Sequence, residues 1–471
     1  MKKKYVRWTL WTIASPFILF VILCILIYLP PIQNFLVDKA AVYASEATGM
    51  NISVGRISLS FPLNLVVTNV DAASPHNDTL LSVRRLQVNV QLLPLLKKQV
   101  EVDGISLQGA TVNSNDLIHG MKLNGTLGEL FISSHGVALD PETAIVNKVL
   151  LKDTDLSLCL NDTAAADTAA SDTTYWKIIL QDIDLQNVSF ALDMPLDSLS
   201  LAASLDNAIL RDGLIDLHKS AYSLQTFRIE NGRVRYDNGK PLAADSLSSG
   251  LDPSHIALTD IGVKLDSLYY GGRNMKAIIS QFVLKERSGV EIVSATGRMV
   301  SNDKVLRVPS LKLETRDSYL ELNAAMDWNA LDFKGEGLVS ARLMADIGKP
   351  DVVRFMGRMD EKFVRQYPSE PLRIRTGIDG DLNKLKLTTL TAELPGALGL
   401  FARGELTHLT DSLLRGGDIT LEAETKDLKF VSTLAEGIEI PYGTRLEGKF
   451  TMAGAKMGTD LLLMQPEAQA V

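Results

Sequence analysis

Two pairs of aspartates come closest to a catalytic arrangement in this sequence. Asp153 and Asp155 are separated by one residue, as are Asp182 and Asp184. Paired carboxylates can divide general acid and general base work when their surroundings separate their pKa values. Both pairs fall in strand-like segments, where residues two apart point to the same side of a sheet. We therefore interpret these acids as part of a solvated face and predict that the protein is not an enzyme.

No other group of residues indicates a reaction. The six histidines are scattered, at positions 76, 119, 135, 218, 255 and 408, without the spacing of metal ligands. The sequence contains no nucleophile elbow, phosphate-binding loop or zinc-binding helix motif. Cys24 lies in an apolar run and Cys159 stands alone, so we expect no disulfide between them. The sequence thus predicts no catalytic residue, no metal and no cofactor.

The charge balance limits the partners. The chain of 471 residues carries a net charge of -8, and four of its cations precede the first apolar run, so the remainder is more acidic still. Binding to a polyanion requires clustered Lys and Arg. We therefore expect no nucleic-acid partner.

Alternation of apolar and polar residues dominates the chain from residue 50 onward. The first stretch, Ile52 to Phe61, alternates with one slip at Gly55, and a later one slips near Asn187, which is typical of a β-bulge. A period of two gives each strand one apolar side. No fixed repeat length emerges, which favours an irregular antiparallel β array. The strongest inward-facing candidates in two of the later segments are Leu156, Leu158, Leu160, Ile183, Leu185, Val188, Phe190 and Leu192.

The N-terminus has the features of a membrane anchor. Trp8 to Leu29 is uncharged and long enough to cross a bilayer as a helix. Four cations precede it, which predicts a cytoplasmic N-terminus and an exported bulk. Trp8, Trp11 and Tyr28 are placed like interface aromatics. A cleaved signal peptide is the alternative, but the apolar run is too long and lacks a small-residue cleavage site, so we favour an uncleaved single-pass anchor over residues 1–29.

Three further segments depart from the strand pattern. Residues 30–49 have helical spacing and predict a juxtamembrane amphipathic helix, which either lies on the membrane surface or caps the first strands. Residues 161–174 contain no apolar side chain larger than alanine, which predicts a disordered loop. Its Asp-Thr-Ala triplets resemble a short acceptor pattern of periplasmic O-glycosylation, with turn formation as the alternative. Residues 350–367 predict an amphipathic helix, either packed on the sheet or guarding an apolar groove.

Three motifs carry a resemblance to a known family. The first starts at Thr48 and reads TG-x-x-I-x-V-G-R-I-x-L-x-F-P-L-x-L. The second starts at Thr79 and reads T-L-L-x-V-x-x-L-x-V-x-V-x-L-L-P-L-L. The third, Val102 to Asn113, reads V-x-x-I-x-L-x-G-A-x-V-N. With the anchor before them, these motifs resemble the opening of the AsmA/TamB family of envelope proteins from double-membraned bacteria, over residues 1 to about 115.

The resemblance implies a fold and a function. The expected fold is an N-terminal transmembrane helix followed, over residues 50–471, by an elongated, open, rolled antiparallel β-sheet that forms a taco-shaped groove, with few short helices. The expected function is passive phospholipid transport between the inner and outer membranes by a protein anchored in the inner membrane, with its bulk in the periplasm.

The resemblance leaves alternatives open. Members of this family are also viewed as assembly factors for outer-membrane β-barrel proteins that work with a barrel partner, and a plain anchored protein with a filled core is the third interpretation. TamB-like chains usually run longer and end in a characteristic β-domain. We therefore expect a partial sequence, and a naturally short member is the alternative.

Overall fold

The computed structural model is mainly β, with 71% of the described residues in strands and few short helices. It describes residues 39, 41–42, 45–46, 48–60, 64–74, 78–91, 102–114, 120–138, 142–161, 175–240, 250–333, 337–357, 359–434 and 440–465. The predicted anchor, with Trp8, Trp11 and Tyr28, lies outside these residues, as do most of the predicted 30–49 helix and nearly all of the 161–174 loop. Within the described residues, no helix combines the length and the apolar character needed to cross a membrane.

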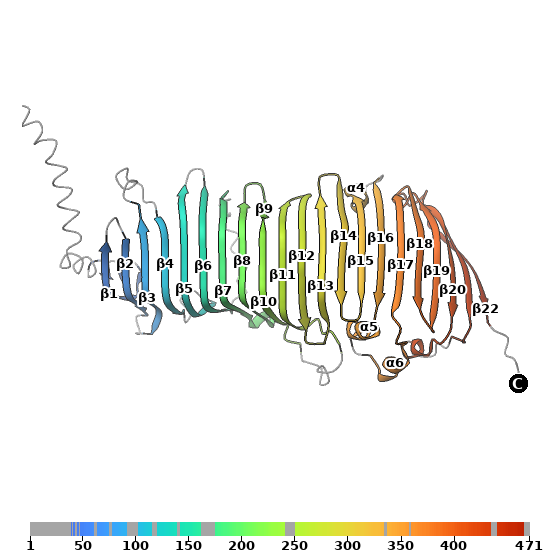
Figure 1. Cartoon of the computed structure of the whole chain (residues 1–471), viewed down its shortest axis with the longest axis horizontal. Coiled ribbons are helices and arrows are strands. Elements are labelled where there is room, and N and C mark those ends of the chain that lie inside the picture. The colour runs from blue at the N-terminus through green and yellow to red at the C-terminus, as the bar shows by residue number, and fades with distance from the viewer. Residues whose placement is uncertain are drawn as a thin grey trace, which may run out of the picture. The chain divides into compact units, whose positions relative to one another are not determined.

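The chain divides into two compact units, residues 1–208 and 209–471. The strands of the first unit are β1 (Asn51–Ser60), β2 (Asn64–Ala73), β3 (Thr79–Val90), β4 (Val102–Asn113), β5 (Met121–Ala138), β6 (Thr143–Leu160) and β7 (Lys177–Met194). Each pairs with the next in chain order, and the five pairs from β1 to β6 are antiparallel. Figure 1 shows these strands side by side.

The last pair of the first unit, β6 with β7, is parallel, which corrects our expectation of antiparallel pairing throughout. Parallel neighbours need a connection that returns to the same end of the sheet, typically a dozen residues or more, whereas a hairpin needs about two. Residues 161–176 provide that length. The sequence offered no sign of this, because a loop without apolar residues is compatible with either direction.

A short 3-10 turn, Pro195–Asp197, leads into β8 (Leu199–Asp216), which begins in the first unit and ends in the second. The second unit continues with β9 (Ala221–Leu224), β10 (Thr226–Asp237), β11 (His255–Gly271), β12 (Asn274–Glu286), β13 (Glu291–Ser301), β14 (Val305–Thr315), β15 (Tyr319–Asp327), β16 (Leu338–Ile347), β17 (Leu372–Asp381), β18 (Lys384–Leu394), β19 (Leu398–Thr407), β20 (Gly416–Thr425), β21 (Arg445–Ala453) and β22 (Lys456–Met464).

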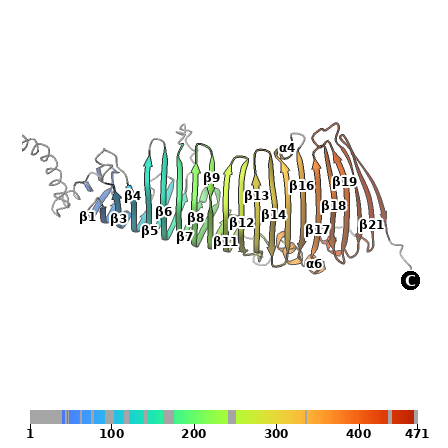
Figure 2. The ribbon, with the colours of Figure 1, turned by 45° about the horizontal axis from the view of Figure 1, so that its top comes forward.

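In the second unit, every successive pair from β10–β11 to β21–β22 is antiparallel, and β9 pairs with both β8 and β11. Most of these strands are joined by short turns, as antiparallel neighbours permit. The turned view of Figure 2 shows β11 to β21 in the same side-by-side order as Figure 1.

Four short helical segments lie at the ends of strands in the second unit. They are α4 (Trp328–Leu331), α5 (Lys349–Met356), α6 (Glu361–Gln366) and a 3-10 helix, η2 (Lys429–Thr433). The single helix expected over 350–367 is therefore two helices. Gly357 ends α5 with a φ of 73°, a conformation that glycine adopts without strain. Asp360 then caps α6 by accepting a hydrogen bond from the Lys362 backbone N–H at 2.8 Å.

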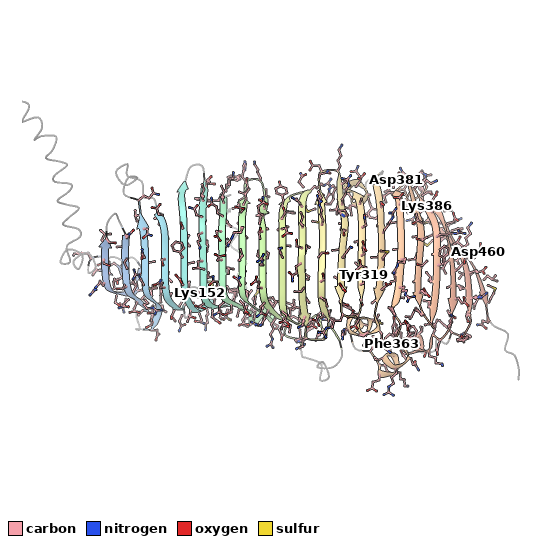
Figure 3. All side chains as sticks on the ribbon, viewed as in Figure 1. Lys152, Tyr319, Phe363, Asp381, Lys386 and Asp460 are labelled. Atoms are coloured by element: carbon pink, nitrogen blue, oxygen red, sulfur yellow. The ribbon has the colours of Figure 1, made fainter. Side chains whose placement is uncertain are left out.

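The largest buried cluster of the described residues lies beside α6 and η2. Phe363 is only 1% exposed, and its ring centroid lies 5.5 Å from that of Tyr367 and 5.8 Å from that of Phe430. Figure 3 labels Phe363 on α6. Phe355, an apolar residue of the same predicted amphipathic helix, is 58% exposed on α5. Phe363 is therefore packed against the protein, as one interpretation of residues 350–367 predicts, and Phe355 is not. The break at Gly357 gives the two helices different surroundings.

Candidate functional site: an uncovered apolar face

The predicted groove residues of β6 and β7 lie beside one another on one face. Backbone pairing places Leu156 opposite Phe190 and Leu158 opposite Leu192. Val188 pairs with Thr154 in the same register. The earlier residues follow the same pattern, since Ile183 pairs with Val149, Leu185 with Leu151, and Leu160 with Met121 of β5. All eight candidates therefore share one side of the sheet.

This face extends over the whole first unit as four rows that run across the strands. The rows are Leu59–Leu65–Val88–Ile105–Ile132–Val149–Ile183, Ile57–Val67–Leu86–Leu107–Leu130–Leu151–Leu185, Val54–Val70–Val83–Ala110–Leu127–Thr154–Val188 and Ile52–Ala72–Leu81–Val112–Gly125–Leu156–Phe190. Every member is apolar except Thr154, whose hydroxyl donates to the Lys152 carbonyl at 3.1 Å. No charge interrupts the rows.

A line of irregular positions crosses the first unit between the second and third rows. We call it the slip row, and it consists of Gly55, Asn69, Arg84, Gly109, Gly128, Asp153 and Asn187. Each member is skipped in the pairing between the residues that flank it. Four of them, Asn69, Gly109, Asp153 and Asn187, have φ between 50° and 62°. The irregularities predicted at Gly55 and Asn187 are therefore confirmed and belong to one line.

The slip row keeps the same face apolar along each strand. In β7 the inward residues are odd-numbered before Asn187, as at Leu185, and even-numbered after it, as at Val188 and Phe190. Without the extra residue, the second half of the strand would turn its apolar side chains to the opposite face. The Asn187 side-chain amide also donates to Asp153 Oδ1 at 2.9 Å, which links the slips of β6 and β7.

Among the residues that the structure describes, no second layer covers the apolar face of the first unit. Of the apolar residues in its four rows, only Ala72 and Val83 are buried, and Leu81, Ile105 and Phe190 are 36–39% exposed. The others are half-buried. In a β-sandwich the inward side chains of one sheet are covered by those of the other. The described residues of this unit therefore form an apolar face that is open to occupation.

The second unit presents a face of the same kind. Across β16 to β20 its rows are Ala341–Ile378–Leu387–Gly404–Ile419, Leu343–Thr376–Leu390–Ala402–Leu421 and Ala345–Ile374–Ala392–Leu400–Ala423. Ala345 and Ala402 are buried, and the leucines and isoleucines are half-buried. The buried clusters of this unit instead lie at strand ends, around Phe363 and around Leu382.

The opposite face of the second unit carries many charged side chains, and several of them form ion pairs. Cations and carboxylates pair between neighbouring strands, for example Lys285 with Asp260 at 2.8 Å and Lys384 with Glu405 at 3.2 Å. Opposite charges across strands contribute a few tenths of a kcal/mol, up to about 1 kcal/mol, per pair. The two faces of the sheet thus differ sharply in polarity, as strand alternation predicts.

The paired aspartates lie on the polar face, in agreement with the solvated interpretation. In the pairing of β6 with β7, Asp182 lies opposite Lys148 and Asp184 lies opposite Leu150. Each aspartate directly precedes an inward residue of β7, so both aspartates lie on the opposite, polar face. Asp155 Oδ2 accepts a hydrogen bond from the Ser189 hydroxyl at 2.6 Å. Among the described residues, no group of three or more His, Cys, Asp or Glu side chains is placed to hold a metal ion.

Sequence reasoning missed a polar furrow on the outer face of the first unit. Its volume is about 580 Å³, and it is lined by Thr68, Asn69, Arg84, Arg85, Gln108, Gly128, Glu129, Lys152 and Asp153. The sequence contains a signal for this furrow. Two polar residues in a row, Arg84-Arg85 and Lys152-Asp153, interrupt strands that otherwise alternate.

Comparison with known proteins does not identify the chain. No family model matches the sequence, and a search of curated proteins finds no significant match. The case for a function therefore depends on the apolar face and on the features of the sequence.

Proposed function

We propose that the protein carries phospholipids between the inner and outer membranes, with their acyl chains shielded against the apolar face. The observation that supports this most directly is the uncharged set of apolar rows in each unit, which in the first unit has no covering layer among the described residues. Each methylene that leaves water for an apolar surface gains about 0.8 kcal/mol. A surface that shields the methylenes of a lipid tail one after another lowers the free-energy barrier to moving the lipid through water. Such transport requires no nucleotide-driven step.

The proposed setting is the periplasm, with residues 1–29 anchoring the chain in the inner membrane. The uncharged run from Trp8 to Leu29 and the cations before it support this topology. We further propose that the sheet is elongated, open and rolled into a groove. In the second unit alone, the strands from β10 to β22, spaced at about 4.8 Å, extend over about 60 Å, which is long enough to hold several lipid molecules.

A second candidate function is assembly of outer-membrane β-barrel proteins. It is supported by β22, all of whose residues are exposed and which, among the described strands, pairs with β21 alone. An exposed strand edge can template the strand of another chain. In that case the ligand is an unfolded polypeptide that binds at an edge rather than a lipid that binds on a face.

Site-specific photo-crosslinking in cells separates these functions. A photoreactive residue at Leu185, in the apolar rows, should capture phospholipid, and the same residue at the adjacent Gln186, on the polar face, should not. Mass spectrometry of the adducts identifies what is captured. Equal lipid capture at both positions, or capture of barrel precursors at Leu185 without any lipid, would contradict the transport proposal.

A further inference from the structure

Three arginines, Arg56, Arg84 and Arg85, lie on the outer face of the first unit. Within the described residues, no ion pair involves Arg56, Arg84 or Arg85. Arg85 Nη2 donates a hydrogen bond to the neutral Gln87 side chain at 3.3 Å. Arg84 and Arg85 are also consecutive and both exposed, so two like charges lie next to each other. This arrangement costs stability unless an anion binds between them.

The slip row brings both arginines to the same side of the sheet. Regular alternation would send Arg84 and Arg85 to opposite faces, but Arg84 occupies the skipped position opposite Asn69 and Gly109. Both arginines consequently line the polar furrow, together with Thr68, Asn69 and Gln108 from β2 and β4.

Gly109 makes room for the Arg84 guanidinium. A methyl group in place of the glycine hydrogen would lie 2.6 Å from Arg84 Nε and 2.9 Å from Arg84 Cζ, and Gly109 has a φ of 62°. The guanidinium therefore rests over the backbone of β4, where only glycine fits without strain. The Arg84 guanidinium thus lies against β4 although no acid among the described residues binds it.

The acids of the furrow lie at its other end. Glu129 is on β5 and Asp153 on β6, roughly 10 and 14 Å from β3 at about 4.8 Å per strand. Asp153 already accepts the Asn187 amide. Lys152, which is labelled in Figure 3, marks that end of the furrow. The end at β2 to β4 is therefore basic, with neutral donors from Thr68, Asn69 and Gln108 around the two arginines.

We propose that Arg84 and Arg85, with Thr68, Asn69 and Gln108, form a binding site for a phosphate group. Guanidinium donors match phosphate oxygens in a planar, bidentate geometry that lysine cannot reproduce. The site lies on the face opposite to the apolar rows, and it does not depend on lipid transport. The phosphate belongs either to a lipid headgroup or to a small soluble molecule.

The test uses the full chain purified in a neutral detergent. Isothermal titration measures binding of inorganic phosphate, glycerol phosphate and dihexanoyl phosphatidic acid at constant ionic strength. We expect Arg84→Gln/Arg85→Gln to weaken binding at least tenfold, and Arg84→Lys/Arg85→Lys to give an intermediate loss because charge is kept and the bidentate fork is not. The matched control is Arg373→Gln/Lys384→Gln, which removes the same charge from paired cations of the second unit.

The outcomes separate the sources of phosphate and can overturn the proposal. Tenfold tighter binding of the lipid than of inorganic phosphate identifies a headgroup, and similar binding of all three identifies the phosphate group alone. The proposal is wrong if none of the three compounds binds the wild-type chain. It is equally wrong if the glutamine variant binds as well as the wild type, or if the control variant loses binding to the same degree. The lysine variant retains both charges, so its result does not depend on how well the glutamine variant folds.

Discussion

His255 connects two carboxylates at the start of β11. Its ring is 6% exposed, with Nδ1 at 2.8 Å from Asp252 Oδ2 and Nε2 at 3.6 Å from Asp237 Oδ1. The hydrogen bond with His255, and then that from the Ser254 backbone N–H, lower the pKa of Asp252 below its ordinary value. These contacts join the end of β10 to the residues that directly precede β11.

The lowered pKa of Asp252 predicts a pH-dependent stability. A carboxyl group whose pKa is lower in the folded state stabilises the fold above its unfolded pKa, and this contribution is lost as the pH falls through the folded pKa. We expect Asp252→Asn to lower the free energy of unfolding by about 1 kcal/mol near pH 7, less than the roughly 1.5–3 kcal/mol of a hydrogen bond to a charged group, because Asp252 is partly exposed to water. The difference from wild type should shrink below about pH 4.

Urea titrations at pH 7 and pH 3 measure this difference. The matched control is Asp379→Asn, a change in an exposed aspartate of β17, which should leave the urea midpoint at pH 7 near the wild-type value. A destabilisation by Asp252→Asn that is equally large at pH 3 would show that the charged form of Asp252 is not what stabilises the connection.

At the level of single strands, the slip row explains how segments with an interrupted alternation still produce one apolar face. The sequence predicted the slips at Gly55 and Asn187, because a period of two changes phase there. It did not predict those at Arg84, Gly109 or Asp153, where neighbouring polar residues obscure the change. Nor did it predict that the seven positions align, since alignment depends on the register between strands. The helix break at Gly357 was missed because the apolar spacing continues through it.

The backbone conformation at Asn187 leads to a testable prediction about the stability of β7. Its φ of 51° is tolerated by Asn and Gly and disfavoured by β-branched residues. Asn187→Val and Asn187→Gly both remove the hydrogen bond to Asp153, so the difference between them isolates the backbone term. We expect the valine variant to be less stable than the glycine variant by about 1–2 kcal/mol.

Hydrogen exchange of the β6 and β7 amides, combined with urea titration, checks this expectation. The valine variant should lose protection on both sides of residue 187 because the strand is pushed toward the wrong register. If the valine and glycine variants are equally stable, the left-handed conformation at this position is not required for the apolar face.

For the molecule as a whole, the open apolar faces predict a dependence on bound lipid. Exposed apolar patches of more than a few hundred Å² are rare on monomeric soluble proteins and mark sites of interaction. A ligand that binds only the folded state stabilises it by about 2.7 kcal/mol at a concentration of 100 times its Kd. We therefore expect exhaustive lipid removal to lower the Tm by several degrees and to increase binding of an apolar fluorescent dye.

Differential scanning calorimetry and dye titration before and after relipidation test this dependence. Adding phospholipid back should restore the Tm and displace the dye, whereas adding a soluble phosphate compound should not displace the dye. A delipidated chain that binds no dye and melts at the same temperature would mean that its apolar faces are covered by protein.

The sequence by itself determined that the chain after residue 50 is mainly β, that its strands have one apolar side, and two of the points where that side changes phase. These properties are local, because alternation is set by consecutive residues. Only the tertiary structure decided that β6 and β7 are parallel, that the slips align, that Arg84 rests over Gly109, and that none of the described residues forms a second layer over the apolar rows of the first unit. Such features depend on which distant residues become neighbours, and strands with equally apolar sides can satisfy that condition in many registers.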